Sequence, residues 1–216
     1  RPAMTSARLF LVFATLLLGH ASSSFAQNDE PIGRFVVDVR GSLVPFGKNE
    51  QLATARQLDP FVTPNLGLGF EAGAHVYVFS WRMITVGLGA NIHGSLGDRH
   101  PAETDPDPDG QTIRKKLTAV SPQLSFNFGG RNGWSYLSGG LGTSRLSLYS
   151  LDQTEPSQRR TRTLNYGGGA RWFVKEHLAF SLDLRFYASK PLKQIGTATG
   201  SPRMTTMALS IGASFK

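Results

Sequence analysis

Hydrophobic and polar residues alternate along most of the chain, and most regularly between residues 164 and 189. Apolar residues from Leu164 to Trp172 alternate with glycine and polar residues, and a second apolar set alternates with small polar residues from Leu178 to Phe186. A period of two places the two sets on opposite faces of a strand. The short gap at 175–177 suits a tight hairpin. One apolar face and one small polar face predict a transmembrane β-hairpin between lipid and a polar lumen.

The same alternation predicts six further strands. They lie at 34–46, 65–78, 84–96, 116–128, 134–149 and 203–215. The strand at 134–149 is the least regular, and its phase slips around Gly139-Gly140, which indicates a β-bulge. The expected fold class is therefore an all-β, eight-stranded antiparallel up-and-down transmembrane β-barrel.

The predicted connections alternate strictly between long and short. They run 47–64, 79–83, 97–115, 129–133, 150–161, 175–177 and 190–202. An even number of strands with this alternation places both termini on one side. Barrels of the bacterial outer membrane have short periplasmic turns and longer extracellular loops, so the long connections are expected outside and both termini in the periplasm.

Aromatic residues and lysines separate a membrane barrel from a soluble barrel with an apolar cavity. Aromatic residues gather near the short connections (Phe35, Phe79, Trp81, Phe128, Trp134, Trp172, Phe180 and Phe215) and near the long ones (Phe46, Phe61, Tyr149, Phe186 and Tyr187). Two aromatic girdles are typical of a membrane barrel. Lysines lie in the predicted loops or at strand ends, whereas a face toward bulk water would carry long charged side chains along the strands. Both observations favour the membrane barrel.

The amino-terminal residues have the pattern of a secretory signal peptide. Met4, the expected initiator, precedes Arg8 and the apolar run from Leu9 to Leu18, and small residues lead to an expected cleavage after Ala26. The predicted organisation is a signal region at 1–26, a short lead at 27–33 and the barrel at 34–216. The chain has no cysteine, which excludes disulfides and thiolate metal sites. Its net charge of +8 lies mostly outside the alternating segments, and no nucleic-acid partner is expected.

Several segments in this order resemble a known family. They are the signal region, the alternating loops, YGGGARWF at 166–173, SLDLRFY at 181–187 and the terminal LSIGASF at 209–215. Together they resemble the small eight-stranded outer-membrane β-barrels, that is, the OmpA-like transmembrane domain without its periplasmic domain. The resemblance implies a monomer surrounded by outer-membrane lipid and lipopolysaccharide. It also implies insertion by the outer-membrane barrel assembly machinery, which reads a last strand ending in an aromatic residue; here Lys216 follows Phe215.

Two short motifs have residue types that could carry chemistry. Asp105 to Gly110 matches the start of a calcium loop, but Lys116 stands where a bidentate glutamate is needed, so a solvated acidic loop is favoured and no metal or other cofactor is expected. His93 and Ser95 share a strand face, as in a barrel-borne lipid A deacylase, with Glu103 the nearest acid. Because this face is the polar one, away from lipid, two lumen-facing polar residues are favoured over a catalytic pair.

Charges on the polar strand faces form the main candidate site. They are Asp38, Arg40, Glu71, Arg171, Asp183 and Arg185, which are expected to pair inside a narrow lumen because isolated charges there are costly. Glycines of the third and sixth strands predict local room beside them. A second set, Arg159, Arg160, Arg162, Lys190 and Lys193, is placed to contact lipopolysaccharide phosphates. The favoured role is non-enzymatic, in surface structure or adhesion; a channel for small solutes or hydrophobic compounds is the first alternative, and a lipid A-modifying enzyme the second.

Overall fold

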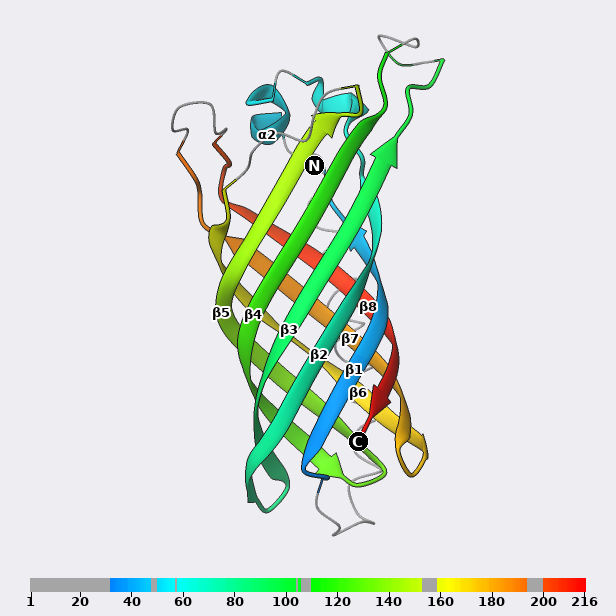
Figure 1. Cartoon of the computed structure of the whole chain (residues 1–216), viewed down its shortest axis with the longest axis vertical. Helices are drawn as coiled ribbons and strands as arrows, with labels where there is room; N and C mark the ends of the chain where they lie inside the picture. Colours follow the sequence, from blue (N-terminus) through cyan, green and yellow to red (C-terminus); the bar gives the residue numbers. More distant parts are fainter. Residues whose placement is uncertain are drawn as a thin grey trace, which may run out of the picture.

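The computed structural model describes residues 32–47, 50–56, 58–103, 105, 110–152, 159–193 and 200–216. Within these residues, eight antiparallel strands close into one barrel, each strand pairing with the next and β8 with β1 (Figure 1). The strands are β1 (Phe35–Pro45), β2 (Leu66–Trp81), β3 (Ile84–Arg99), β4 (Ile113–Gly130), β5 (Gly133–Ser150), β6 (Thr161–Lys175), β7 (Leu178–Ser189) and β8 (Met204–Phe215). The predicted fold class is confirmed. The predicted signal region at 1–26 lies outside the described residues.

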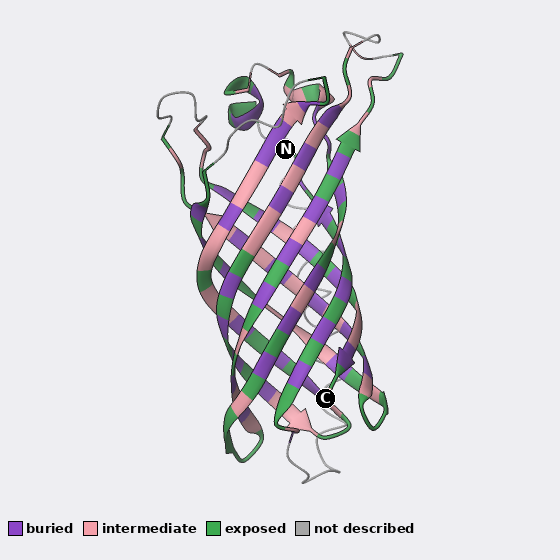
Figure 2. Ribbon diagram, in the orientation of Figure 1, coloured by how far each residue is buried: buried purple, intermediate pink, exposed green. Residues whose placement is uncertain are grey.

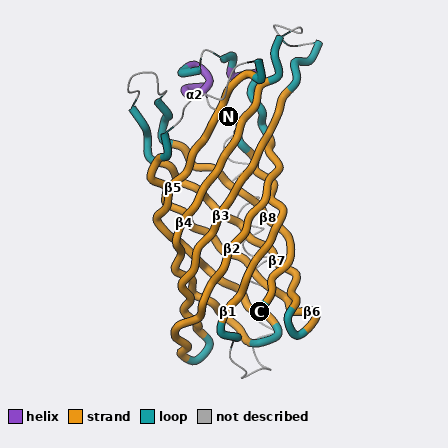
Figure 3. The backbone as a smooth tube through the Cα atoms, in the orientation of Figure 1, coloured by secondary structure: helices purple, strands orange, loops and turns teal. Residues whose placement is uncertain are grey.

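The connections alternate as predicted. Two-residue turns join β2 to β3, β4 to β5 and β6 to β7, while the other connections are longer and gather at the opposite end of the barrel (Figures 1 and 3). The chain ends at the short-turn end, after β8. The barrel therefore has a short-turn end, which carries the carboxyl terminus, and a long-loop end.

Burial alternates along every strand, as Figure 2 shows. In β1, Val36, Asp38, Arg40, Ser42 and Val44 are buried inside, and the residues between them are exposed. The outer face is apolar, with Leu68 68% exposed and Leu141 75% exposed. Apolar side chains on a face that no other described residue covers match an environment of lipid.

The predicted bulge in β5 is wrong. The register of β5 with β6 runs without a shift through Gly139 and Gly140. Its register with β4 is interrupted at 140–142 but is the same on both sides, and the shifts occur instead at Tyr77/Phe79 and Phe173/Lys175. The strand keeps one phase, but apolar residues occupy its inner face at both ends. Trp134 and Tyr136 lie inside at the short-turn end and Leu148 at the long-loop end, and this change of polarity imitates a change of phase.

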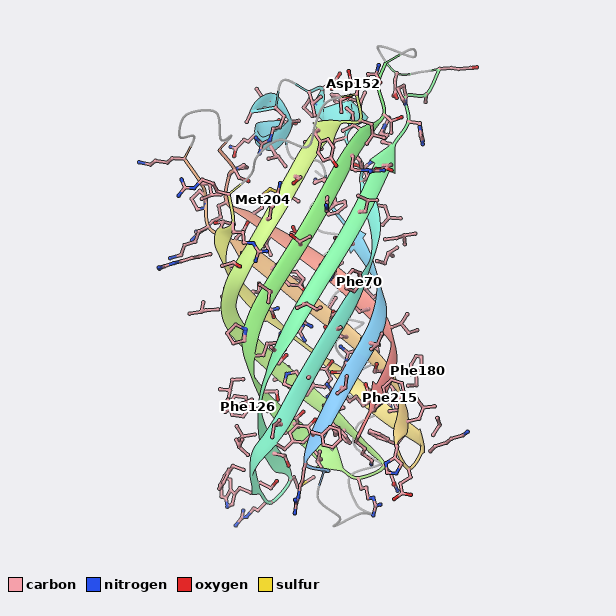
Figure 4. All side chains as sticks on the ribbon, in the orientation of Figure 1. Phe70, Phe126, Asp152, Phe180, Met204 and Phe215 are labelled. Carbon is pink, nitrogen blue, oxygen red and sulfur yellow. The ribbon has the colours of Figure 1, made fainter. Side chains whose placement is uncertain are left out.

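The aromatic girdles are confirmed only in part. Phe126, Phe180 and Phe215 project from the barrel toward its short-turn end (Figure 4), and Trp81 and Trp172 are also exposed there. Trp134, Phe46 and Tyr187, however, are at most 6% exposed and point inward. Tyr77 and Phe173 pack against Trp134, so these rings close the lower lumen rather than meeting lipid.

The lysine prediction also needs correction. β4 begins at Ile113, three residues before the predicted boundary, and so includes Lys115 and Lys116. Lys115 is 1% exposed, and its ammonium contacts the carbonyl oxygens of Phe46 and Gly47. A lysine inside a strand is tolerated here because its head reaches backbone acceptors at the barrel mouth.

The loop between β1 and β2 folds over the long-loop end. It carries the short helix α2 (Glu50–Thr54) and the 3₁₀ helix η2 (Pro60–Val62), whose N-cap Asp59 accepts a hydrogen bond from the Phe61 amide. Leu52 of α2 is fully buried against Ile113, Leu148 and Met204. The sequence analysis predicted only a connection here, whereas the structure shows a lid with its own apolar contacts.

No helix in the described part of the chain is long and apolar enough to cross a membrane.

Candidate functional site

The barrel lumen brings together all six charged residues of the main candidate site. They come from four strands: Asp38 and Arg40 from β1, Glu71 from β2, Arg171 from β6, and Asp183 and Arg185 from β7. Each sits at an inward position of the two-residue period, and each is at most 3% exposed. The strand register places Arg40 opposite Glu71, and ion pairs across the lumen bring the other charges together.

Asp38 forms the centre of one part of this lumen network. Arg171 donates to both carboxylate oxygens, from Nε at 2.8 Å and from Nη2 at 2.6 Å. Arg40 lies 2.8 Å away as an ion pair, and the Ser214 hydroxyl also donates to Asp38. The guanidinium of Arg171 stacks over the Tyr136 ring at 4.0 Å. Asp38 thus has a bidentate partner, a second cation and a hydroxyl donor, which offset its loss of water.

Arg40 connects this part of the network to Glu71. Its Nη1 donates to Glu71 Oε1 at 2.9 Å, and its Nε donates to the Ser181 hydroxyl. Glu71 also accepts from Asn91 Nδ2 and from the Ser210 hydroxyl, each at 2.9 Å. The carboxylate therefore receives donors from three other strands, β1, β3 and β8.

Arg185 organises the third part. It donates to both oxygens of Asp183, at 3.0 and 2.8 Å, and to Asn165 and Ser138. Its Nε lies 3.8 Å from Glu71 Oε1, which joins this part to the rest. The Tyr136 hydroxyl donates to Asp183 at 2.5 Å. Three arginines and three carboxylates thus form one connected and formally neutral set.

Sequence reasoning missed some members of this network. Tyr136, Asn165 and Ser138 supply hydrogen bonds to the charges, yet none was singled out from the sequence. Without a bulge in β5, alternate residues back from Ser144 through Ser138 share the inner face. This alternation also places Tyr136 on that face. Asn165 lies opposite Tyr187 on the inner face of the predicted hairpin and was visible in the same way.

The lumen glycines do not leave open space, contrary to the expectation from the sequence. A Cβ on Gly87 would lie 2.9 Å from Cδ1 of Tyr77, and a Cβ on Gly169 would lie 2.8 Å from the Tyr136 hydroxyl. The space beside Gly87 is therefore filled by Tyr77 and the Ser125 hydroxyl, and the space beside Gly169 by the Tyr136 hydroxyl and the backbone of Leu182. The glycines make the filled lumen possible.

His93 and Ser95 lie together but lack a third catalytic group among the described residues. His93 Nε2 is 3.2 Å from the Ser95 hydroxyl, both residues are at most 5% exposed, and the His93 ring packs on Tyr187. His93 Nδ1 has no hydrogen-bond partner, whereas a Ser–His pair needs an acid there to orient the imidazole. The pair also faces the lumen, where a lipid substrate has no access from the membrane side.

The predicted acidic loop falls mostly outside the described residues, since 106–109 are not part of them. Asp105 is described, and it accepts hydrogen bonds from the Ala102 amide and from Arg99. These contacts, the backbone hydrogen bond above all, hold the pKa of the Asp105 carboxyl below its ordinary value. Across the described ranges, no three histidine or carboxylate side chains converge on a point that could hold a metal ion.

The second set of basic residues lies at the long-loop end. Arg159, Arg160, Arg162, Lys190 and Lys193 are all exposed. Arg162 is in β6 on its outward face, and its carbonyl oxygen accepts a hydrogen bond from the Lys190 amide. The structure thus places two of these residues, Arg162 and Lys190, side by side on the barrel rim.

Comparison with known proteins identifies the fold. No family model and no curated protein sequence matches the chain. Among solved structures it is similar to Neisserial surface protein A, with 14% identity over 84% of this chain and 96% of that one and a TM-score of 0.54. It is also similar to Ail, the attachment invasion locus protein of Yersinia pestis, with 14% identity, coverage of 85% and 99%, and a TM-score of 0.45. At these identities the likeness shows the fold alone, which is that of the small eight-stranded outer-membrane barrels, as the sequence resemblance indicated.

Proposed function

We propose that this chain, which has the fold of the small eight-stranded outer-membrane barrels, is a closed, non-enzymatic surface protein of a bacterial outer membrane. The observation that carries the proposal is the lumen network: three arginines and three carboxylates, each at most 3% exposed, linked across the barrel. Eight strands leave an interior only just wide enough for side chains. A filled, neutral lumen argues against the channel alternative.

Because the lumen is filled, the functional surface of the protein under this proposal is the long-loop end. The lid around α2 and the extensions of β3, β4 and β5 stand on this end, and it carries the exposed basic residues (Figure 1). Under this proposal the loops face outward and act in surface structure or adhesion, while both termini lie in the periplasm. The incomplete His93–Ser95 pair is the reason for setting the lipid A-modifying alternative aside.

Lipid and lipopolysaccharide are the proposed surroundings, with the barrel assembly machinery acting during insertion. The exposed aliphatic and aromatic band suits acyl chains, and Arg159, Arg160, Arg162, Lys190 and Lys193 supply cations near the outer rim. Phosphate groups accept strong charge-assisted hydrogen bonds from such side chains. The outer-rim position supports contact with lipopolysaccharide phosphates.

Single cysteines test the location and the orientation together. The chain has no cysteine, so Asp152→Cys and Glu176→Cys each introduce the only thiol. Both positions are exposed and lie at opposite ends, Asp152 at the long-loop end (Figure 4) and Glu176 in the turn after β6. In intact Gram-negative cells, an impermeant maleimide should label only the cysteine at position 152. After lysis, it should label the cysteines at both positions. Labelling of 176 alone would reverse the orientation, and recovery of the protein in the soluble periplasm would defeat the proposal.

A further inference from the structure

Arg56 carries a buried charge that no part of the lumen network balances. It follows α2 in the lid, where its amide donates to the Ala53 carbonyl oxygen at 2.9 Å. All three guanidinium nitrogens are shielded from solvent, and none has a hydrogen-bond partner among the described residues. Burial lowers the pKa of Arg56 from its ordinary value, yet a guanidinium stays ionised at neutral pH. An ionised group with five N–H donors and no acceptor is strongly unfavourable in such a place.

Arg56 also lines a small cavity of ≈ 20 Å³. Arg56 and Arg159 both line it, together with hydroxyl residues such as Ser144, Thr161, Ser189 and Ser201. None of the described lining residues is acidic. Arg159, on the wall of the same cavity, is exposed to solvent.

Several of the lining hydroxyls are already engaged. Thr161 donates to the Lys190 carbonyl oxygen at 2.7 Å and Ser189 donates to that of Met204 at 3.1 Å, while Ser144 pairs with Thr163 at 2.6 Å. These contacts fix the walls and provide no counter-charge for Arg56. What the cavity lacks is an anionic acceptor, and a guanidinium matches an oxyanion with two parallel N–H···O bonds.

The size of the cavity limits what can enter. A space of ≈ 20 Å³ holds about one water-sized group, so one oxyanion edge fits inside and the rest of a larger molecule stays outside at Arg159. The residues that would be joined belong to three different connections: Arg56 between β1 and β2, Arg159 between β5 and β6, and Ser201 between β7 and β8. A single anion there would tie together three loops of the outer mouth.

We propose that the mouth of the barrel is an oxyanion-binding site, in which Arg56 from the lid and Arg159 from the rim hold a phosphate or carboxylate group and thereby order the outer loops. The ligand class is a small oxyanion, either free or as the terminal group of a glycan or lipid. The site is separate from the lumen network. It does not depend on the proposed surface role, because the refolded barrel alone should bind the anion.

Calorimetry on the refolded full-length barrel, with inorganic phosphate as the probe in a buffer of fixed ionic strength, tests the site. Saturable binding is expected, with slower amide exchange in residues 50–56 when phosphate is present. Arg56→Gln should weaken binding by about tenfold or more, because a charge-assisted pair is lost. Arg159→Gln should weaken it less, since that side chain is exposed. Arg203→Gln is the matched control, because Arg203 is exposed, lies two residues after Ser201 and does not line the cavity, and it should bind as the unmodified protein does.

A second measurement guards against a folding artefact. Without anion, amide exchange in the lid should be slower in Arg56→Gln than in the unmodified protein, because an unpaired buried charge has been removed. With saturating phosphate, exchange should be slower in the unmodified protein. Tighter binding of lipopolysaccharide than of its dephosphorylated form would identify a lipid-linked phosphate as the source, whereas equal binding of the two forms beside normal phosphate binding would identify a free anion. Absence of saturable phosphate binding, or equal binding by Arg56→Gln and the unmodified protein, would overturn the proposal.

Discussion

Replacing Arg185 with alanine perturbs the lumen network at its most connected cation. Arg185 is 1% exposed, donates to Asp183 at 3.0 and 2.8 Å and to Asn165 at 2.8 Å, and lies 3.8 Å from Glu71. Without it, three carboxylates face two arginines. Of the hydrogen-bond donors described above for Asp183, only the Tyr136 hydroxyl remains. Removing one partner of a buried pair costs roughly 3–5 kcal/mol, because the other charge is left uncompensated.

The structure provides a matched control for this substitution. Arg114 also makes a bidentate pair, with Asp98 at 2.7 and 2.6 Å, but its side chain is 30% exposed on the outer face of the barrel. Arg114→Ala should therefore cost less than about 1 kcal/mol. The double variant Arg185→Ala with Asp183→Asn should be more stable than Arg185→Ala alone, because the stranded carboxylate is gone.

Reversible urea unfolding in lipid vesicles measures these differences. Tryptophan fluorescence reports the transition, and the mobility of unheated samples on a gel confirms that each variant closes. The reasoning requires a larger loss for Arg185→Ala than for Arg114→Ala by at least about 2 kcal/mol. Equal losses in the two variants, both below about 1 kcal/mol, would show that the lumen charges are not energetically coupled.

Two further substitutions test the packing of the lumen and of the lid. Gly169→Ala places a Cβ against the Leu182 carbonyl oxygen and 2.8 Å from the Tyr136 hydroxyl, so the free energy of unfolding should fall by about 1–3 kcal/mol. Gly139→Ala is the control and should be nearly neutral, because the nearest atom to its Cβ is 3.4 Å away. Equal losses of the two variants in urea unfolding would refute the crowding argument. Leu52→Ala removes the lid's contact with Ile113, Leu148 and Met204 and should speed amide exchange in residues 50–56 by an amount equivalent to about 2–3 kcal/mol. Leu151→Ala is the control and should leave this exchange unchanged, because Leu151 is exposed. Unaltered exchange in Leu52→Ala would mean that the lid is not held by this contact.

The fold followed from the sequence because a membrane barrel repeats one simple rule. Each strand needs an apolar face for lipid and a small or polar face for the lumen, so a period of two is visible in all eight strands. The short connections then indicate that successive strands are antiparallel neighbours. The same rule placed the six network charges on the inner face, since residues such as Asp183 and Arg185 lie two apart between exposed or half-buried apolar neighbours.

The errors arose where the lumen itself is apolar. Trp134 and Phe46 were assigned to the lipid boundary because large aromatic residues are common there, but both plug the ends of the lumen. Lys115 was assigned to a loop because a lysine inside a membrane strand is rare; its carbonyl partners come from a segment 68 and 69 residues away in sequence. The cavity beside Arg56 depends on three loops meeting at the mouth, and no local pattern in the sequence encodes that meeting.

Planar-bilayer recording of the refolded, unmodified protein tests the central claim, the closed lumen, most directly. The six paired charges and the rings of Tyr77, Trp134 and Tyr136 fill the interior, so the protein should show no stable channel openings. Arg185→Ala, which removes a buried guanidinium from that interior, should give measurable openings. Frequent, stable openings in the unmodified protein that Arg185→Ala leaves unchanged would contradict the account and favour a channel.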